Sequence, residues 1–414
     1  MTEPSAVARL SRDLTSALKA DDLEDFYRDL HRHPETAFRE HRTAGKLAGR
    51  LRSAGYRVAE GVGGTGVVGV LENGDGPVVW LRGDLDALPV TEATGLEYAS
   101  TTAGVMHACG HDLHLTWLAG AAEALAAGRA TWSGTLVVVG QPAEEVGGGA
   151  AAMVRDGLHE RFPRPDALFG QHVTPGPAGL CSHTPGLIMS ASDDLDVVVH
   201  GVGGHGSRPE STVDPVVTAA YIVTRLQAVL AREVAARDAV VLTVGQFHAG
   251  TQHNIIPAEA RLALNLRTQD PRVRERVLAA VRRTVEGECR AAGCPVDPEI
   301  SVRSGFPNTV NDAELDASVA AVHRQVLGEG AVFDFGPAMG SEDFALLAPD
   351  GVPYAYWFLT STPPDVWRAA PGDDLQQKLD RVPGNHSPLF APDPSVLMPG
   401  VLTLVSAALT RLAS

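Results

Sequence analysis

The stretch TLVVVGQPAEE, residues 135–145, carries the pattern that decides the fold. Its first part, Thr135 to Gly140, is a short apolar run rich in valine, which predicts a buried strand. Two adjacent carboxylates, Glu144 and Glu145, follow almost at once. Ligands of open α/β sheets bind beyond the carboxyl ends of the strands. A strand that runs into ionisable side chains therefore predicts an α/β domain with a site at this edge of its sheet.

Two other predicted strands end in the same way. Asp84 and Asp86 follow the run that ends near Arg82, and His172 follows the run that ends at Gly170. A single loop of this kind would be explained by ordinary solvated charge. Three such loops, all with side chains that can bind a metal, favour one shared site.

The first half of the chain alternates helix and strand, and this rhythm returns near the C-terminus. The predicted elements are helices at 23–55, 113–125, 312–327 and 394–412, and strands at 66–71, 78–82, 167–170, near 332 and at 352–359. The polar, proline-rich stretch 360–392 is long for a loop without structure of its own. Because His386 lies in it, we expect this stretch to have a function.

The middle of the chain follows a different order. Strands are predicted at 195–200, 239–247, 258–267 and 299–303, with helices at 214–236 and 271–292. In the third strand, apolar residues alternate with polar ones, which predicts one buried face. The order β-α-β-β-α-β is that of a ferredoxin-like unit. We therefore expect an α/β catalytic domain with an open mixed sheet, residues 1–187 and 304–414, and an inserted ferredoxin-like α+β domain, residues 188–303.

Composition narrows the class of protein. The 414 residues exceed the size of a usual single core, which agrees with two domains. The net charge is -16 and no basic run is present, which argues against nucleic acid or an anionic membrane as a partner. The start of the chain lacks the apolar stretch of a secretory signal, and no window approaches the length of a membrane span. The four cysteines are too few and scattered for a disulfide framework, so we expect a cytoplasmic protein.

The segment HACGHDLH, residues 107–114, combines three imidazoles, a thiol and a carboxylate. These are the groups that bind zinc and related divalent ions. A lone histidine or cysteine is more often packed or solvated, but the clustering raises the odds of a metal site. A structural zinc site would need two or more cysteines at short spacing, whereas only Cys109 is nearby. A catalytic metal site therefore fits better.

Adjacent residues point in different directions, so Glu144 and Glu145 can divide their work between binding a metal and taking a proton. The alternative is a solvated acidic loop, but the glycines at 147–149 would let the backbone approach closely and favour a site. His172 and His386 lie on comparable loops. The candidate ligands are then five: Cys109, His111, Glu145, His172 and His386. Five ligands are too many for one tetrahedral ion and suit two ions with a bridging group.

Seven motifs extend over nearly the whole chain. They are LHRHPE (30–35), RGDLDALP (82–89), MHACGHD (106–112), QPAEE (141–145), GGHGS (203–207), NIIP (254–257) and GSEDF (340–344). Together they resemble the M20 family of metallopeptidases, and specifically its amidohydrolase branch of aminoacylases, hippurate hydrolases and auxin-conjugate hydrolases. The pattern is most similar to that of bacterial enzymes that cleave N-acylated glutamine. Leu113 and Ser387 depart from it, since glycine and asparagine are frequent there, and both could alter the shape of the pocket.

The resemblance implies a role for each candidate residue. The five ligands above would hold the metals, Glu144 would act as general base and then acid, and Asp86 would orient a ligand. His205 of the inserted domain would reach the active site of a partner subunit and stabilise the oxyanion, so that the insertion serves as lid and dimerisation domain. Asn254 and Arg267 would hold the substrate carboxylate, although a solvated arginine on a strand is the commoner case.

We therefore expect a homodimeric, metal-dependent amidohydrolase that cleaves small N-acyl amino acids to a carboxylic acid and an amino acid. Two divalent ions per subunit are expected, zinc or manganese first, with cobalt and nickel as alternatives. A metal-dependent dipeptidase or carboxypeptidase of the same fold is the nearest rival. A catalytically silent metal-binding protein is the other, and the intact Glu144 argues against it.

Overall fold

The structure is a computed structural model that describes residues 4–413. It divides into two compact units. The first comprises the chain up to Ile188, Val310–Gly336 and the chain from Asp343 onward, and the second comprises Met189–Thr309 and Pro337–Glu342. These two units are defined by the compactness of the structure, whereas the two predicted domains are defined by sequence pattern. The predicted limits of the domains therefore stay a prediction.

Within the described residues, the first unit contains an eight-stranded mixed sheet in the order β1-β2-β4-β3-β5-β16-β6-β15. Its strands are β1 (Arg57–Val62), β2 (Gly66–Asn73), β3 (Val78–Asp84), β4 (Gly134–Gln141), β5 (Ala167–Pro177), β6 (Cys181–Ser182), β15 (Val332–Phe333) and β16 (Tyr354–Thr362). The central neighbours β4, β3, β5 and β16 are parallel, whereas β1 and β2 are antiparallel additions at one edge. The predicted open mixed sheet is confirmed.

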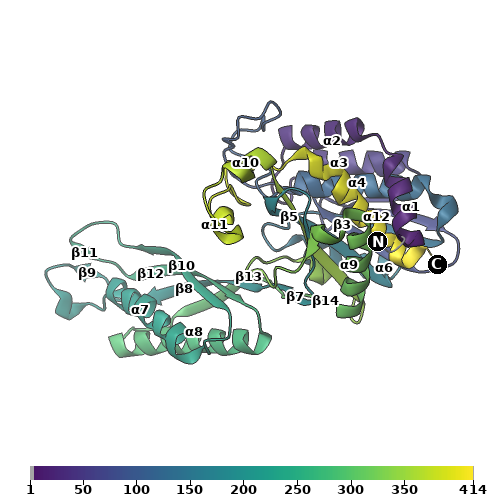
Figure 1. Cartoon of the computed structure of the whole chain (residues 1–414). Helices are drawn as coiled ribbons and strands as arrows, with labels where there is room; N and C mark the ends of the chain where they lie inside the picture. Colours follow the sequence, from purple (N-terminus) through teal and green to yellow (C-terminus); the bar gives the residue numbers. More distant parts are fainter. Residues whose placement is uncertain (1–3, 414) are drawn as a thin grey trace. The chain divides into compact units, whose positions relative to one another are not determined.

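Helices cover this sheet (Figure 1). They are α1 (Ala6–Ser16), α2 (Ala20–Arg32), α3 (His41–Ser53), α4 (His111–Ala127), α5 (Gly149–Arg155), α6 (Leu158–Arg161), α9 (Ala313–Leu327), α10 (Pro364–Ala369), α11 (Leu375–Leu379) and α12 (Leu397–Leu412). Helices α4 and α12 pack on each other and on β3. Most residues of both helices are buried, as expected for helices that are apolar on nearly every side.

Some predicted elements of the first unit are corrected by the structure. The single helix expected at 23–55 is wrong, because the chain breaks between α2 and α3, where Pro34 has no amide hydrogen to donate. Strand β1 had no prediction. The strand before His172 continues to Pro177, so that His172 lies within β5. The stretch 360–392 contains the short helices α10 and α11.

The second unit has the predicted ferredoxin-like order. Strands β8 (Ala191–His200), β10 (Val240–Ala249), β12 (Glu259–Thr268) and β13 (Glu299–Phe306) form an antiparallel sheet in the order β10-β12-β8-β13. Helices α7 (Pro215–Glu233) and α8 (Pro271–Ala292) lie together along this sheet (Figure 1). The second unit also contains the short strands β9 (Gly204–His205) and β11 (Ile255–Ile256), whereas β7 (Gly186–Met189) and β14 (Thr309–Asn311) lie mostly in the first unit. The alternating residues of β12 bury one face, as predicted.

One segment corrects an expectation about membranes. Pro394–Leu412 is long and apolar enough to cross a membrane, so the expectation that no window approaches that length is wrong for this segment. Within the structure, 67% of its most apolar window is buried. Its apolar composition is therefore explained by its packing against α4, α1, α9 and the sheet.

The contact between α4 and α12 depends on a glycine. A Cβ placed on Gly400 would lie 2.2 Å from the ring of Trp117. We expect Gly400→Ala to lower the free energy of unfolding by about 1–3 kcal/mol, the usual cost of overpacking, despite the higher helix propensity of alanine. The midpoint of thermal unfolding measures the effect.

Gly49→Ala in α3 is the matched control, because a Cβ at Gly49 meets nothing within 4 Å. There we expect a gain of about 0.5–1 kcal/mol from helix propensity alone. Equal midpoints for the two variants would contradict close packing of α4 on α12.

Candidate metal and catalytic centre

Three adjacent parallel strands bring the predicted residues to one edge of the sheet. In the order β4-β3-β5, Glu144 and Glu145 follow β4, Asp86 follows β3, and His172 lies midway along β5, just past the residues that pair with β3. Parallel neighbours end at the same edge, which is where open α/β sheets bind ligands. The loop before α4 adds Cys109, and His111 is the first residue of that helix.

The six residues expected at the metal and catalytic cluster come together. Groups of donor atoms that all lie within 4.8 Å of one another are formed by Cys109, His111 and His172, by Cys109, Glu145 and His386, and by His111, Glu144 and Glu145. The first two groups share the sulfur of Cys109. Two donor sets joined by one common atom fit two divalent ions with a bridging ligand.

The Glu145 carboxylate spans the two donor sets. Its Oε1 lies 3.7 Å from Nε2 of His111, and its Oε2 lies 3.4 Å from Nε2 of His386. Glu144 also approaches His111, with its Oε2 3.9 Å from Nε2 of that imidazole. Cys109 completes the cluster with Sγ 3.5 Å from Nε2 of His172.

The electrostatics of the cluster favour a bound cation. Nε2 of His111 and Oε1 of Glu145 are buried and have no hydrogen-bond partner among the described residues, although they face each other. Burial raises the pKa of Glu145 to about 7 and raises the pKa of the Cys109 thiol well above its ordinary value. Buried polar atoms without partners are costly, and divalent cations would satisfy all of these groups at once.

Asp86 fixes both glutamates and one imidazole. Its carboxylate accepts hydrogen bonds from the backbone amides of Glu144 (3.1 Å) and Glu145 (3.0 Å). Its backbone carbonyl lies 2.9 Å from Nδ1 of His111 and accepts the ring N–H. The lone pair of His111 is therefore on Nε2, which faces the cluster. This is the tautomer that a metal ligand requires.

His172 is oriented in the same manner. Its Nδ1 lies 2.6 Å from the carbonyl oxygen of Val173, which leaves the Nε2 lone pair directed at Cys109. Below it, Nε2 of His114 accepts from the Val173 amide at 2.8 Å, and Nδ1 of His114 donates to Asp84 at 2.7 Å. Thus Asp84 acts on β5 through His114.

A buried polar network supports the loops from beneath. Arg82 donates to Asp84 at 2.8 Å and to Gln141 at 2.9 Å, and Gln141 in turn donates to Asp343 at 2.6 Å. The other carboxylate oxygen of Asp343 accepts from the amide of Ala150, beyond the two glutamates. Arg82, Gln141 and Asp343 belong to the motifs at 82–89, 141–145 and 340–344. These three motifs therefore contain residues that support the loops of the centre.

The loop that carries His386 is tied to the Cys109 loop. The amide of His386 donates to the Ala108 carbonyl at 2.7 Å, and the side chain of Asn385 donates to the carbonyls of Cys109 and Val173. Gly110, the residue after Cys109, has a φ of 81°, and a Cβ on it would lie 2.4 Å from the side chain of Val173. Asn385 was not predicted, and its position beside a candidate ligand was the only signal for it.

Sequence reasoning also missed Glu40, which is fully buried. One of its oxygens accepts from the amides of Phe38 (3.0 Å) and Ala143 (2.9 Å), and the other accepts from the Thr65 hydroxyl. Both amides belong to residues with positive φ, 59° and 49°. Glu40 therefore holds the main chain just before Glu144 in a conformation that residues other than glycine rarely adopt.

The other predicted residues lie in the second unit, so their part in the centre stays a prediction. His205 and Asn254 are exposed and neighbour each other, since the Gly206 amide donates to the Asn254 carbonyl. Arg267 lies near the far end of β12, where it donates to Asn265 and to the Met339 carbonyl.

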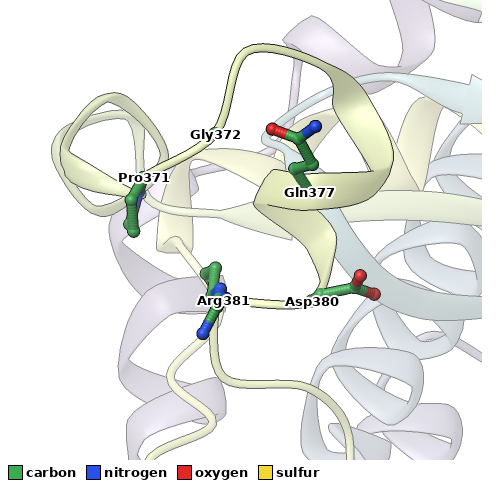
Figure 2. Close-up of a pocket in the computed structure, with 5 residues that line it drawn as sticks. All are labelled: Pro371, Gly372, Gln377, Asp380 and Arg381. Atoms are coloured by element: carbon green, nitrogen blue, oxygen red, sulfur yellow. The ribbon is translucent and has the colours of Figure 1, made fainter.

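The stretch before His386 also forms a pocket of about 290 Å³ at α11. Figure 2 shows its lining residues, Pro371, Gly372, Gln377, Asp380 and Arg381. This lining contains none of the predicted ligands, so we do not assign the pocket to the centre.

The fold and the donor groups define the chain as a metal-dependent hydrolase. Residues 80–370 match the model of the peptidase family M20/M25/M40. The chain belongs to this family, and within it to the amidohydrolase branch, as predicted.

Individual relatives cover most of the chain. Thermostable carboxypeptidase 1 of Saccharolobus solfataricus is 34% identical over 401 residues, which are 94% of this chain and 97% of that protein. The hippurate hydrolase of Campylobacter jejuni is 38% identical over 328 residues, 78% of this chain and 84% of that protein. The structure of a dinuclear metal-binding peptidase of the M20 family from Bacillus subtilis is 27% identical, has a TM-score of 0.73 and covers 94% of this chain and 98% of that one.

We expect Glu40→Ala to disturb the loop of the two glutamates. The Ala143 and Phe38 amides would lose their acceptor, and each buried donor left unpaired costs about 1–3 kcal/mol. The thermal midpoint should fall, and the metal retained per chain after dialysis should fall with it. Glu60→Ala on β1 is the control, because the Glu60 side chain is 42% exposed. Retention of metal equal to that of the parent would contradict a role of Glu40 in holding this loop.

Proposed function

We propose that this protein hydrolyses the amide bond of N-acyl amino acids and releases a carboxylic acid and a free amino acid. The observation that carries the proposal is the division between the two glutamates. Glu145 lies within 3.7 Å of His111 and 3.4 Å of His386, and the neighbouring Glu144 lies 3.9 Å from His111. One carboxylate is thus placed as a ligand and its neighbour as a proton carrier. The similarity to a hippurate hydrolase supports an N-acyl amino acid as the substrate class.

Two divalent ions would be held by Cys109, His111, Glu145, His172 and His386. When bound, these ions supply Lewis acidity, which polarises the amide carbonyl and makes water more acidic. We propose zinc or manganese, with cobalt or nickel as alternatives, because mixed thiolate, imidazole and carboxylate donors accept all four.

In this proposal Glu144 carries one proton from water to the leaving nitrogen. Glu144 takes a proton from water, and the water oxygen forms a bond to the amide carbonyl carbon. The C–N bond then breaks while Glu144 returns the proton to the leaving nitrogen. One water is consumed and Glu144 ends ionised as it began. Throughout, Asp86 holds the backbone amide of Glu144, which keeps the carboxylate in reach of the reacting atoms.

The same proposal gives the second unit its role. Arg267 and Asn254 would hold the substrate carboxylate, and His205 would stabilise the oxyanion that forms at the carbonyl. Along β12, Glu259 and Arg267 are separated by about 26 Å of extended strand, and Asn254 lies beyond Glu259. Arg267 and the pair His205 and Asn254 of one chain are therefore too far apart for one small substrate. This separation supports a homodimer in which each centre receives residues from both chains.

A carboxypeptidase or dipeptidase activity is the second candidate, favoured by the similarity to a thermostable carboxypeptidase. Either substrate class presents a carboxylate next to the scissile amide. They differ in the free α-amino group of a dipeptide. A panel of N-acetyl, N-benzoyl and N-acyl-glutamine substrates against dipeptides, with released amino acids identified, separates the two.

We expect Glu144→Gln to reduce kcat at least about 10³-fold while metal content stays at the parental level, because the amide keeps the shape but cannot accept the proton. Metal analysis and kcat are measured on the same sample. Glu60→Gln, an exposed site on β1, is the matched control. Activity that survives Glu144→Gln would overturn the assignment of the base, and a metal-loaded parent inert toward the whole panel would favour a catalytically silent protein.

Mixing two inactive variants tests the shared centre. If His205 acts across a dimer, co-refolded Glu144→Gln and His205→Ala chains form heterodimers with one intact centre each, so activity should recover to about a quarter of the parental value. If His205 acts within its own chain, every centre lacks one group and no recovery occurs.

A further inference from the structure

A second cluster of metal-binding side chains lies inside the first unit, apart from the centre described above. Cys181 is in β6, His183 follows it, and His323 is on α9. One donor atom from each lies within 4.8 Å of the others. All three side chains are buried, with exposed fractions of 0%, 3% and 0%.

The outer nitrogens of the two imidazoles are fixed by acceptors. Nδ1 of His183 lies 2.7 Å from Oδ1 of Asp316, and Nε2 of His323 lies 3.0 Å from the carbonyl oxygen of Thr403. A carbonyl only accepts, so Nε2 of His323 carries a hydrogen. The Asp316 carboxylate likewise accepts from Nδ1 of His183. A carboxylate or carbonyl behind an imidazole is the usual outer partner of a metal-bound histidine.

The inner nitrogens then face each other with lone pairs. Nε2 of His183 and Nδ1 of His323 are 2.8 Å apart, and Sγ of Cys181 lies 3.8 Å from Nδ1 of His323. Two lone pairs in a buried space repel each other unless a positive charge lies between them. That charge is either one proton or a metal ion.

The third donor decides between a proton and a metal ion. A proton between the two nitrogens would leave the Cys181 sulfur only a long contact with Nδ1 of His323, whereas sulfur and imidazole together are the preferred donors of zinc. Charge also balances, because a divalent ion, a Cys181 thiolate and the Asp316 carboxylate sum to zero.

We propose that Cys181, His183 and His323 form a second metal site, which holds a zinc-class divalent ion with three protein ligands. Binding breaks the S–H bond of Cys181, releases that proton and the proton shared by the two rings to solvent, and changes no oxidation state. With Zn–N bonds of about 2.0–2.1 Å and a tetrahedral angle, the two nitrogens stand about 3.3 Å apart, so the rings separate by about 0.5 Å. The ion links β6 to α9 and, through the Thr403 carbonyl, to α12.

The surroundings make this ion slow to exchange. Trp357 stacks on His183 with ring centroids 5.6 Å apart and meets His323 edge-on at 5.0 Å. Because the ligands are buried behind this ring, the ion enters as the chain folds, and a chelator removes it only on unfolding. This behaviour distinguishes it from ions of the catalytic centre, where the His386 side chain is 56% exposed.

The experiment uses the full chain refolded with zinc, treated with a chelator while folded and analysed for metal per chain. We expect about one zinc to survive in the parent and none in Cys181→Ala. Cys289→Ala, another buried cysteine, is the matched control and should keep it. Asp316→Asn, which leaves all three ligands in place, should weaken zinc binding about 10–100-fold.

A cobalt spectrum covers the case in which Cys181→Ala does not fold. In a Cys109→Ser background loaded with cobalt, a thiolate-to-cobalt absorption band should persist after chelator treatment. A folded parent that keeps no zinc, or a Cys109→Ser sample without the band, would overturn the proposal and leave a shared proton between the two histidines. These measurements do not depend on activity, so they stand or fall separately from the proposed function.

Discussion

Asp86 connects three parts of the centre that are distant in sequence. Its two carboxylate oxygens accept the consecutive amides of Glu144 and Glu145, while its carbonyl sets the tautomer of His111. The contact is short-range because β3 and β4 are parallel neighbours, so that the loops following them leave the sheet side by side. The proposed metal ligand Glu145, the proposed proton carrier Glu144 and the start of α4 are thereby positioned by one side chain and its own carbonyl.

Beneath this contact the chain buries charge that a typical protein core avoids. Arg82, Asp84 and Asp343 are all fully or almost fully buried. Buried ion pairs contribute little net stability, because desolvation offsets much of their attraction. Here they orient groups instead, since Asp84 acts on β5 through His114 and Asp343 ties Gln141 to the segment after the glutamates. The scaffold of the centre thus depends on hydrogen-bond direction more than on apolar packing.

The parts that were predictable from sequence are those with a local pattern. The valine-rich run that ends in carboxylates predicted β4 and its loop, and the spacing of Cys109 and His111 before a helix predicted two members of the donor cluster. Glu40 could not be found in this way, because its partner is the backbone amide of Ala143, 103 residues away, and an amide has no sequence signature. The pairing of His183 with His323, 140 residues apart, likewise depends on the tertiary fold. Pro34 is a sequence signal for the break between α2 and α3, but the helical pattern on both sides of it predicted one continuous helix.

Phe38, Ala143 and His386 are the three residues other than glycine, among residues 4–413, whose φ is positive. Each such conformation costs on the order of 1–3 kcal/mol, so together they amount to a large part of the stability of an ordinary domain. Two of them precede or form the donor groups, and the third is held by the same carboxylate as Ala143. Short peptides copied from these loops would relax to other backbone angles and lose the arrangement of donors. Affinity for the ions is therefore a property of the assembled fold. Release of the ions should accordingly report the loss of folded structure around these loops.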